Sequence, residues 1–222
     1  MLRDSRPSAG STHLSVNGPL RSGCTPEAPH PYAATVTILI QACNKLRKAA
    51  GTAAAVSGAS AASVAASVAA VPLRPPQPPP LRTLWRGVRD PALSTALMGE
   101  FLQRGGCELG FLSASTERAV AERYAERSQA ATPSTTSHAL LLLKLSAPDL
   151  PQHRGAAVSF LSAFPGESEC LFPPGTYLRP VSREPSLVVS ASAVAGGDGG
   201  VRLVLRLLKI VEVLPIVQCT VV

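Results

Sequence analysis

The chain has 222 residues, of which 45% are hydrophobic, so it is long enough to bury one sizeable core and to carry an extra segment. The net charge is +7, but the first 48 residues hold six of the 21 cationic residues and only two of the 14 anionic ones, which argues against a basic nucleic-acid face on a folded domain. Five scattered cysteines without a Cys-x-x-Cys pair argue against a disulfide framework or a zinc knuckle, and favour a reducing compartment.

The N-terminal part begins with a tail and a helix. Residues 1–31 are rich in Ser, Pro and Gly and show no periodicity, which predicts a disordered tail. The first residues also lack the apolar stretch of a secretory signal. From residue 32 to residue 48 apolar side chains recur and cations gather at the end, which predicts a helix.

Residues 49–80 are interpreted as a low-complexity insert. Residues 49–73 carry no charge and consist mostly of Ala, Ser and Val. Their length would allow a transmembrane helix. Membrane insertion is driven by Leu, Ile and Phe, however, and residues 49–72 contain none of these. We therefore expect no membrane span here, and the proline-rich run at 75–80 predicts an extended spacer.

Globular sequence occupies residues 81–222 and alternates short strands with helices. Asp90-Pro91 supplies an N-cap and a first helical residue, and Gly105-Gly106 ends that helix. Ser115 or Thr116 can cap the next helix, which contains Tyr124. Strands are expected at 82–88, 110–115, 138–145 and 156–164. Two more are expected on either side of a Pro-Pro-Gly turn at 173–175, and residues 196–200 are expected to form a loop or hairpin tip. Residues 201–213 are ambiguous, because their charges have helical spacing but their β-branched content favours a strand.

Glu167 and Glu169 form a Glu-x-Glu pair just before the Pro-Pro-Gly turn. On an extended segment, residues i and i+2 face the same side, so both carboxylates would project into one space. Two anions that close disfavour each other's ionisation. Most Glu-x-Glu pairs are solvated surface, so the spacing alone does not indicate a site.

Two short motifs that precede the Glu-x-Glu pair make a functional site there more plausible than the spacing alone does. Trp85-Arg86-Gly87 comes first, Phe-Leu-Ser-Ala-Ser follows at 111–115, and Glu-Ser-Glu at 167–169 leads into Cys-Leu-Phe-Pro-Pro-Gly. The ordered trio resembles the arginine-serine-glutamate class of mono-ADP-ribosyltransferases. Members of that family carry an aromatic-Arg-Gly piece, then Phe-x-Ser-Thr-Ser, then Glu-x-Glu followed by an apolar pair and Pro-Pro-Gly.

The resemblance covers residues 81–180 well, residues 36–48 loosely and residues 201–214 by position alone. In the loose part, Asn44 ahead of Leu46 and Arg47 is similar to the family's Asn-x-x-Leu-Arg helix. The tail and the insert are not covered. Ala114 stands where the family usually has Thr, and the tryptophan that often precedes the Phe is missing.

This resemblance implies an α+β fold in which two small, mostly antiparallel sheets form an NAD cleft, with helices in the N-terminal part. It implies a transferase that moves ADP-ribose from NAD⁺ or NADP⁺ to arginine side chains of proteins and releases nicotinamide. The dinucleotide would be consumed as a substrate, and neither a resident cofactor nor a metal would be needed.

The resemblance also implies roles for individual residues. Glu169 would stabilise an oxocarbenium-like ribose, as carboxylates do in glycoside hydrolysis. Glu167 would hold the guanidinium of the acceptor and aim one nitrogen at the sugar. Ser113 would orient Glu169 and touch the nicotinamide ribose. The implied NAD-binding set comprises Arg86, as a planar fork for the pyrophosphate, with Gly87, Ser113 and Ser115.

Two alternatives stay open at this stage. The same fold could serve mainly as an NAD glycohydrolase, or it could be a catalytically inactive module that binds a partner, as Ala114 and the missing tryptophan suggest. The expected partners are NAD⁺ and an arginine-bearing protein, with no nucleic acid and no membrane. We expect a monomer in the cytoplasm.

Overall fold

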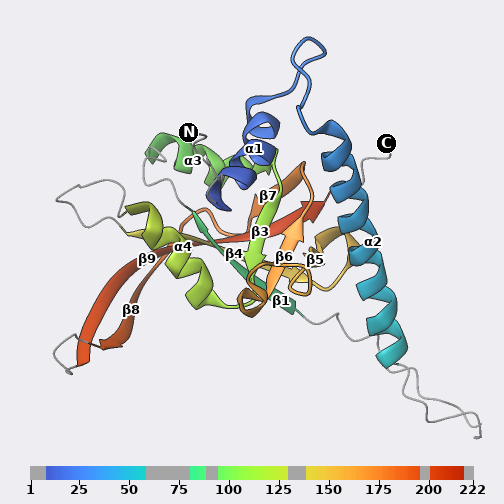
Figure 1. Ribbon diagram of the computed structural model, residues 1–222. Coiled ribbons are helices and arrows are strands. Elements are labelled where there is room, and N and C mark those ends of the chain that lie inside the picture. The colour runs from blue at the N-terminus through green and yellow to red at the C-terminus, as the bar shows by residue number, and fades with distance from the viewer. Residues whose placement is uncertain (1–8, 59–80, 89–94, 130–138, 196–200, 218–222) are drawn as a thin grey trace, which may run out of the picture.

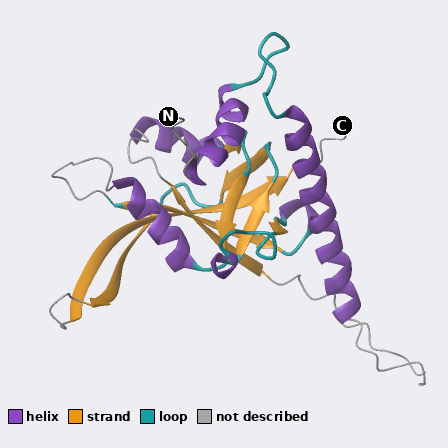
Figure 2. Ribbon diagram, in the orientation of Figure 1, coloured by secondary structure: helices purple, strands orange, loops and turns teal. Residues whose placement is uncertain are grey.

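The computed structural model describes residues 9–58, 81–88, 95–129, 139–195 and 201–217, and these combine helices with a large sheet. The helices are α1 (Ala9–Ser22), α2 (Ala33–Gly58), α3 (Thr95–Arg104) and α4 (Arg118–Gln129), with short 3-10 turns η1 (Pro151–His153) and η2 (Pro165–Glu167). Figure 2 shows the helices placed around the strands. The expected α+β class is confirmed.

Nine strands pair into one connected sheet. They are β1 (Leu81–Val88), β2 (Gly106–Glu108), β3 (Leu112–Ser115), β4 (Leu140–Pro148), β5 (Ala156–Ala157), β6 (Glu169–Phe172), β7 (Thr176–Pro180), β8 (Ser186–Ala195) and β9 (Val201–Val217). The order is β2-β7-β9-β4-β1-β3-β6-β5, with β8 paired to β9. Among the strands of the described ranges only the β4–β9 pair is parallel, so this sheet is mostly antiparallel, as expected.

The sheet has two parts that are joined at a single residue pair. β1 runs beside β4 over its whole length, whereas β1 and β3 meet only where Trp85 pairs with Ser115. The three strands β3, β6 and β5 therefore form a small second sheet that shares one point with the larger one. In Figure 1, β3 and β6 run in a different direction from β1 and β4. This junction brings the Arg86 segment next to the strands that carry the serine and glutamate motifs.

Apolar side chains from both parts of the sheet fill a common core. Leu112 and Phe172 of the small part are 1% and 0% exposed, and Leu145 and Val213 of the large part are 1% and 0% exposed. Burying each such side chain stabilises the fold by roughly 1.5–3 kcal/mol. Because one cluster holds all four, the two parts of the sheet are fixed relative to each other.

Helix α4 packs directly on β1 at Gly87. A Cβ atom at this position would lie 2.1 Å from the carbonyl oxygen of Ala121 and 2.8 Å from the amide nitrogen of Ala125. Only a residue without a side chain allows this approach of strand and helix. The visible role of Gly87 is therefore to seat α4 on the sheet.

The N-terminal part is more ordered than the sequence indicated. The expected disordered tail at 1–31 contains α1, although Pro19 lies within the helix. The expected helix at 32–48 is present as part of α2, but it continues to Gly58 and so enters the expected insert. Alanine, the best helix former, is frequent in that extension.

One expected strand is shorter in the structure, and the segment left ambiguous is a strand. The apolar run at 156–164 forms a strand only at Ala156–Ala157 and continues as a loop toward η2. The ambiguous C-terminal segment is the long strand β9, which pairs with β8 as a ribbon that extends away from the rest in Figure 1. The expected helix N-cap at Asp90 and the hairpin tip at 196–200 lie outside the described residues.

We predict that Gly87→Ala lowers the free energy of unfolding by about 1–3 kcal/mol, because the added methyl group overpacks the β1–α4 contact. Gly99→Ala is the matched control, since no atom lies within 4 Å of its added Cβ. In helix α3 this control should raise stability by roughly 0.5–1 kcal/mol. Urea denaturation measures both, and equal stability of the two variants would contradict the proposed packing role.

Candidate functional site

The serine and glutamate motifs meet because β3 and β6 pair in antiparallel register. Ser115 lies opposite Glu169, and Ser113 lies opposite Leu171, so Ser113 and Glu169 are diagonal neighbours. Diagonal side chains on one face of a sheet are within reach of each other. Ser113 Oγ donates a hydrogen bond of 2.5 Å to Glu169 Oε1. Two predicted site residues that are far apart in sequence are thus brought into direct contact.

The Glu169 carboxylate is held at both of its oxygens. Ser162 Oγ donates to Glu169 Oε2 at 3.2 Å, from the loop between β5 and η2. Two donors, one on each oxygen, fix the orientation of this carboxylate. The sequence reasoning missed Ser162, because it assigned this segment to a strand and no motif marks the position.

Arg86 lies next to the same strand. Its Nη1 donates to the backbone carbonyl oxygen of Ser113 at 2.7 Å. The side chain is 21% exposed, so the guanidinium is partly open to solvent. Ser113 therefore links the three strands, because its backbone carbonyl accepts from Arg86 of β1 and its hydroxyl donates to Glu169 of β6.

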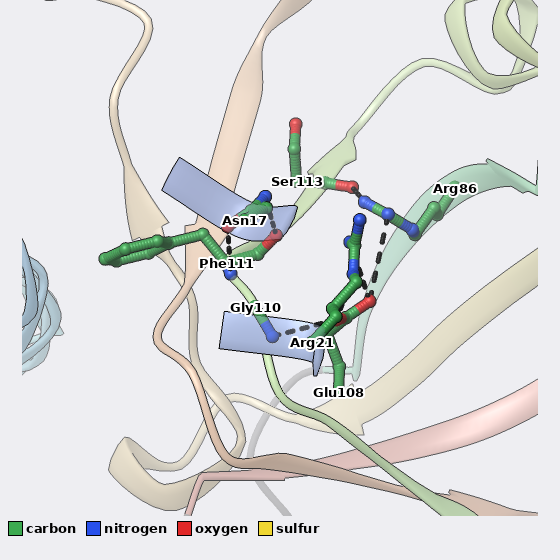
Figure 3. Close-up of polar contacts among 7 residues, drawn as sticks. All are labelled: Asn17, Arg21, Arg86, Glu108, Gly110, Phe111 and Ser113. Carbon is green, nitrogen blue, oxygen red and sulfur yellow. Dashed lines mark hydrogen bonds and ion pairs between the residues drawn. The ribbon is translucent and has the colours of Figure 1, made fainter. Parts of the chain in front are cut away.

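A second arginine reaches this region from α1. Arg21 donates from Nε to Glu108 Oε1 at 2.8 Å and from Nη2 to Glu108 Oε2 at 3.1 Å. Arg86 Nη2 lies 4.0 Å from Glu108 Oε2. Figure 3 shows the two guanidinium groups converging on one carboxylate from different elements. The pair of cations makes this part of the site suited to a phosphate group.

The charge state of Glu108 is set by this cluster. Burial raises its pKa, but hydrogen bonds from Arg21 and from the backbone N–H of Gly110 oppose that effect. The positive charges of Arg21 and Arg86 add to the opposition and hold the pKa of Glu108 below its ordinary value of 4.5. At neutral pH the carboxylate is therefore ionised between two cations.

Asn17 attaches α1 to the strand that carries Ser113. Its side chain is 2% exposed and pairs with the backbone of Phe111 in both directions, as Figure 3 shows. Phe111 N donates to Asn17 Oδ1 at 2.9 Å, and Asn17 Nδ2 donates to the Phe111 carbonyl oxygen at 3.2 Å. The Asn17 amide thus satisfies both backbone groups of Phe111, as a neighbouring strand would, and this pairing fixes α1 beside the site.

The sequence of α1 itself carries a signal that the expectation for residues 36–48 overlooked. The Asn-x-x-Leu-Arg spacing is met by Asn17, Leu20 and Arg21. The segment first compared with it ends at Arg47, which is 5% exposed and donates to the carbonyl oxygens of Arg154 at 2.5 Å and Pro151 at 2.6 Å. Arg47 therefore ties α2 to η1 and to the loop that follows it, whereas Arg21 lies at the site.

Glu167 does not share an extended segment with Glu169, which corrects the geometry expected for the Glu-x-Glu pair. Glu167 ends η2, and Ser168 between the two glutamates has a left-handed backbone with a φ of 47°. Glu167 Oε2 accepts a hydrogen bond of 3.0 Å from Tyr124 Oη of α4. The two carboxylates thus have separate supports, because Glu169 is held by serines and Glu167 by a tyrosine.

Ser115 has a structural position, although it was expected in the NAD-binding set. The residue is 4% exposed. Its Oγ donates to the carbonyl oxygen of Glu167 at 2.6 Å and accepts from the backbone N–H of Glu117 at 2.9 Å. The hydroxyl therefore joins the start of α4 to the turn before β6.

Large apolar side chains lie exposed next to the glutamates. Phe160, Leu161 and Phe164, in the loop between β5 and η2, are 69%, 71% and 58% exposed. The same loop carries Ser162, which contacts Glu169. An exposed apolar cluster beside polar groups is typical of a surface that contacts another protein.

The described ranges show neither a metal-binding cluster nor a membrane-spanning helix. Within them, no three His, Cys, Asp or Glu side chains gather closely enough to hold a metal ion. The helices of the same ranges include none that is long and apolar enough to cross a membrane.

No protein-family model matches the sequence, and no curated protein matches it at a significant level. Solved structures that match include the ADP-ribosyltransferase HopU1 of Pseudomonas syringae pv. tomato DC3000, with 18% identity over 60% of this chain and 46% of that chain and a TM-score of 0.35. Plx2a, an ADP-ribosyltransferase toxin from Paenibacillus larvae, matches with 18% identity over 60% of this chain and 61% of that chain and a TM-score of 0.33.

Exoenzyme S from Pseudomonas aeruginosa, solved with human 14-3-3 protein beta and bound to carba-NAD, matches with 14% identity over 60% of this chain and 48% of that chain and a TM-score of 0.30. The chain thus spans roughly half the length of HopU1 and exoenzyme S, and less than two thirds of Plx2a.

We predict that the stabilising effect of Glu108 disappears in acid. Its pKa is lowered in the folded state, so its contribution is present above pH 4.5 and is lost as the pH falls through the folded pKa. Glu108→Gln should therefore be less stable than the wild type at neutral pH, and this difference should shrink below pH 4.5.

Urea denaturation at a series of pH values measures this difference. Glu100→Gln is the control, because the Glu100–Arg104 pair is exposed on α3 and contributes little. A difference between wild type and Glu108→Gln that stays constant across the acid range would contradict the pKa assignment.

Proposed function

We propose that this chain is a mono-ADP-ribosyltransferase that transfers ADP-ribose from NAD⁺ to arginine side chains of a protein. The observation that carries the proposal is the hydrogen-bonded chain from Arg86 through Ser113 to Glu169. These residues come from three separate motifs whose order resembles that of the transferase family. Their contact in the fold supports a common function for the three motifs.

Glu169 is suited to stabilise a cation that develops at the ribose. Cleavage of the nicotinamide–ribose bond passes through an oxocarbenium-like state, in which positive charge builds on C1′ and the ring oxygen. A carboxylate whose orientation is fixed in advance lowers the energy of that charge without having to reorganise. Ser113 and Ser162 supply this orientation for Glu169.

The pyrophosphate would lie at the paired guanidinium groups of Arg86 and Arg21. Both are planar donors that match phosphate oxygens, and Glu108 holds them close to each other. Arg86 also contacts the backbone of Ser113, so a phosphate bound here lies near the strand that carries the catalytic hydroxyl. The arrangement therefore supports a dinucleotide that extends from the arginines toward Glu169.

Glu167 would receive the guanidinium of the acceptor. The C1′–N bond to nicotinamide breaks with its electron pair going to nicotinamide, and a guanidinium nitrogen then forms the new bond to C1′ while it releases a proton to solvent water. A carboxylate that binds the guanidinium places the attacking nitrogen near the sugar. The exposed apolar residues Phe160 and Phe164 are suited to contact the protein that bears this arginine.

The position of Ala114 supports an enzyme over an inactive binding module. Ala114 is 4% exposed and belongs to the same apolar cluster as Leu112 and Phe172. The serines on either side of it point away from that cluster and make the contacts described above. The loss of the usual threonine hydroxyl therefore falls in the core and leaves the contacts of Ser113 intact.

We predict that Glu169→Gln reduces both nicotinamide release and transfer to agmatine, by on the order of 10²-fold or more, because the variant lacks the charge needed in the transition state. Glu167→Gln should reduce transfer to agmatine far more than it reduces hydrolysis of NAD⁺, because only the acceptor loses its partner. Parallel chromatography of nicotinamide and of ADP-ribosylated agmatine measures both. Full activity of Glu169→Gln would rule out the transferase assignment, and equal losses of both activities in Glu167→Gln would rule out its acceptor role.

Arg86→Lys should raise the KM for NAD⁺ on the order of tenfold, because a point charge does not replace a two-pronged donor at a phosphate. Arg179→Lys on β7 is the matched control, since that residue is exposed and lies on a different strand. Steady-state kinetics with varied NAD⁺ measures the effect. An Arg86→Lys variant with the KM of the control would exclude Arg86 from the NAD⁺ site.

A further inference from the structure

We propose that Tyr124 is the positioning residue that sets the ratio of arginine transfer to NAD⁺ hydrolysis, by holding Glu167 in the orientation that receives the acceptor. The inference rests on the proposed function and extends it to a residue outside the three motifs. Its basis is the hydrogen bond of 3.0 Å from Tyr124 Oη to Glu167 Oε2.

The tyrosine stands on a helix that is fixed to the sheet. Helix α4 seats on β1 at Gly87, and Ala121 and Ala125 on the contacting face are each 2% exposed. Near the start of α4, the Arg118 guanidinium lies 5.5 Å from the centre of the Trp85 ring, a cation–π contact. The phenol of Tyr124 therefore has a defined position relative to β1 and Arg86.

The backbone of Glu167 is held by the same part of the molecule. Ser115 Oγ donates to the Glu167 carbonyl oxygen at 2.6 Å, and the N–H of Thr116 donates to the Ser168 carbonyl oxygen at 3.4 Å. The left-handed conformation of Ser168, with φ of 47° and ψ of 49°, is unusual for a residue with a side chain. These contacts maintain the backbone of the turn. The hydrogen bond from Tyr124 fixes the side-chain carboxylate of Glu167.

The supports of the two glutamates do not overlap. Glu169 is held by Ser113 and Ser162, whereas the Glu167 side chain is held by Tyr124. A change at Tyr124 therefore reaches the acceptor carboxylate without touching the donors on Glu169. This separation makes the two activities independently adjustable.

The chemistry of the contact suits an acceptor site. A carboxylate accepts about four hydrogen bonds, so a phenol on Oε2 leaves capacity for a guanidinium. In the described residues, no donor to Glu167 Oε1 is present. With one oxygen fixed by Tyr124, the carboxylate loses less conformational freedom when the acceptor binds, and the attacking nitrogen is better aimed. Without the phenol, water competes more effectively with the acceptor for the sugar.

The test uses Tyr124→Phe in the full chain, with NAD⁺ alone and with NAD⁺ plus agmatine. Losing a hydrogen bond to a charged group should lower kcat/KM for agmatine on the order of tenfold. Nicotinamide release without acceptor and the KM for NAD⁺ should change by less than about twofold. Tyr177→Phe is the matched control, because that phenol donates to the backbone of Arg104, and it should alter neither activity.

A double-mutant cycle separates a positioning role from a general structural one. In the Glu167→Gln background, Tyr124→Phe should have much less effect on the ratio of transfer to hydrolysis. The role of Tyr124 would be overturned if Tyr124→Phe reduced transfer and hydrolysis in parallel and so left their ratio unchanged. It would also be overturned if Tyr124→Phe changed the ratio equally in the wild type and in Glu167→Gln. A wild-type chain that releases no nicotinamide would instead overturn the proposed function, and this inference with it.

Discussion

The site depends on the antiparallel pairing of β3 with β6. That register places Ser113 diagonally opposite Glu169, and it puts Ser115 where its hydroxyl reaches the turn that carries Glu167. A shift by one residue would turn every side chain of β3 to the other face of the sheet and would bury the serines in the core. The apolar contacts of Leu112 and Phe172 set the register, so the core determines the geometry of the polar site.

A second constraint comes from charge. Glu108 holds Arg21 and Arg86 together, and this links α1 to β1 at the edge of the site. Two guanidinium groups near each other repel, and the carboxylate between them compensates for that repulsion. Binding a phosphate would add negative charge to the same cluster, which the two cations can accept. The N-terminal helix is therefore a component of the site.

Motif order groups Arg86, Ser113 and Glu169 without any knowledge of the fold, and the structure brings these three residues into contact. The α1 contacts were missed, although Asn17, Leu20 and Arg21 have the Asn-x-x-Leu-Arg spacing. Pro19 and the Ser- and Gly-rich surroundings disfavour a helix locally, and the helix is held by the distant partners of Asn17 and Arg21. The strand expected at 156–164 ends at Ala157, and Phe160 and Leu161 are exposed in the loop that follows, because the apolar pattern does not show whether a neighbouring strand is there to pair with. The role of Ser162 follows only from the three-dimensional arrangement.

We propose that this architecture serves to cleave one bond, between nicotinamide and the ribose. The most direct measurement is product analysis of NAD⁺ turnover by the full chain, with NAD⁺ that carries deuterium at ribose C1′ run beside unlabelled NAD⁺. We predict release of nicotinamide and slower cleavage of the labelled substrate, because C1′ becomes nearly planar in an oxocarbenium-like transition state. Release of no nicotinamide, or cleavage at the pyrophosphate instead, would contradict the account.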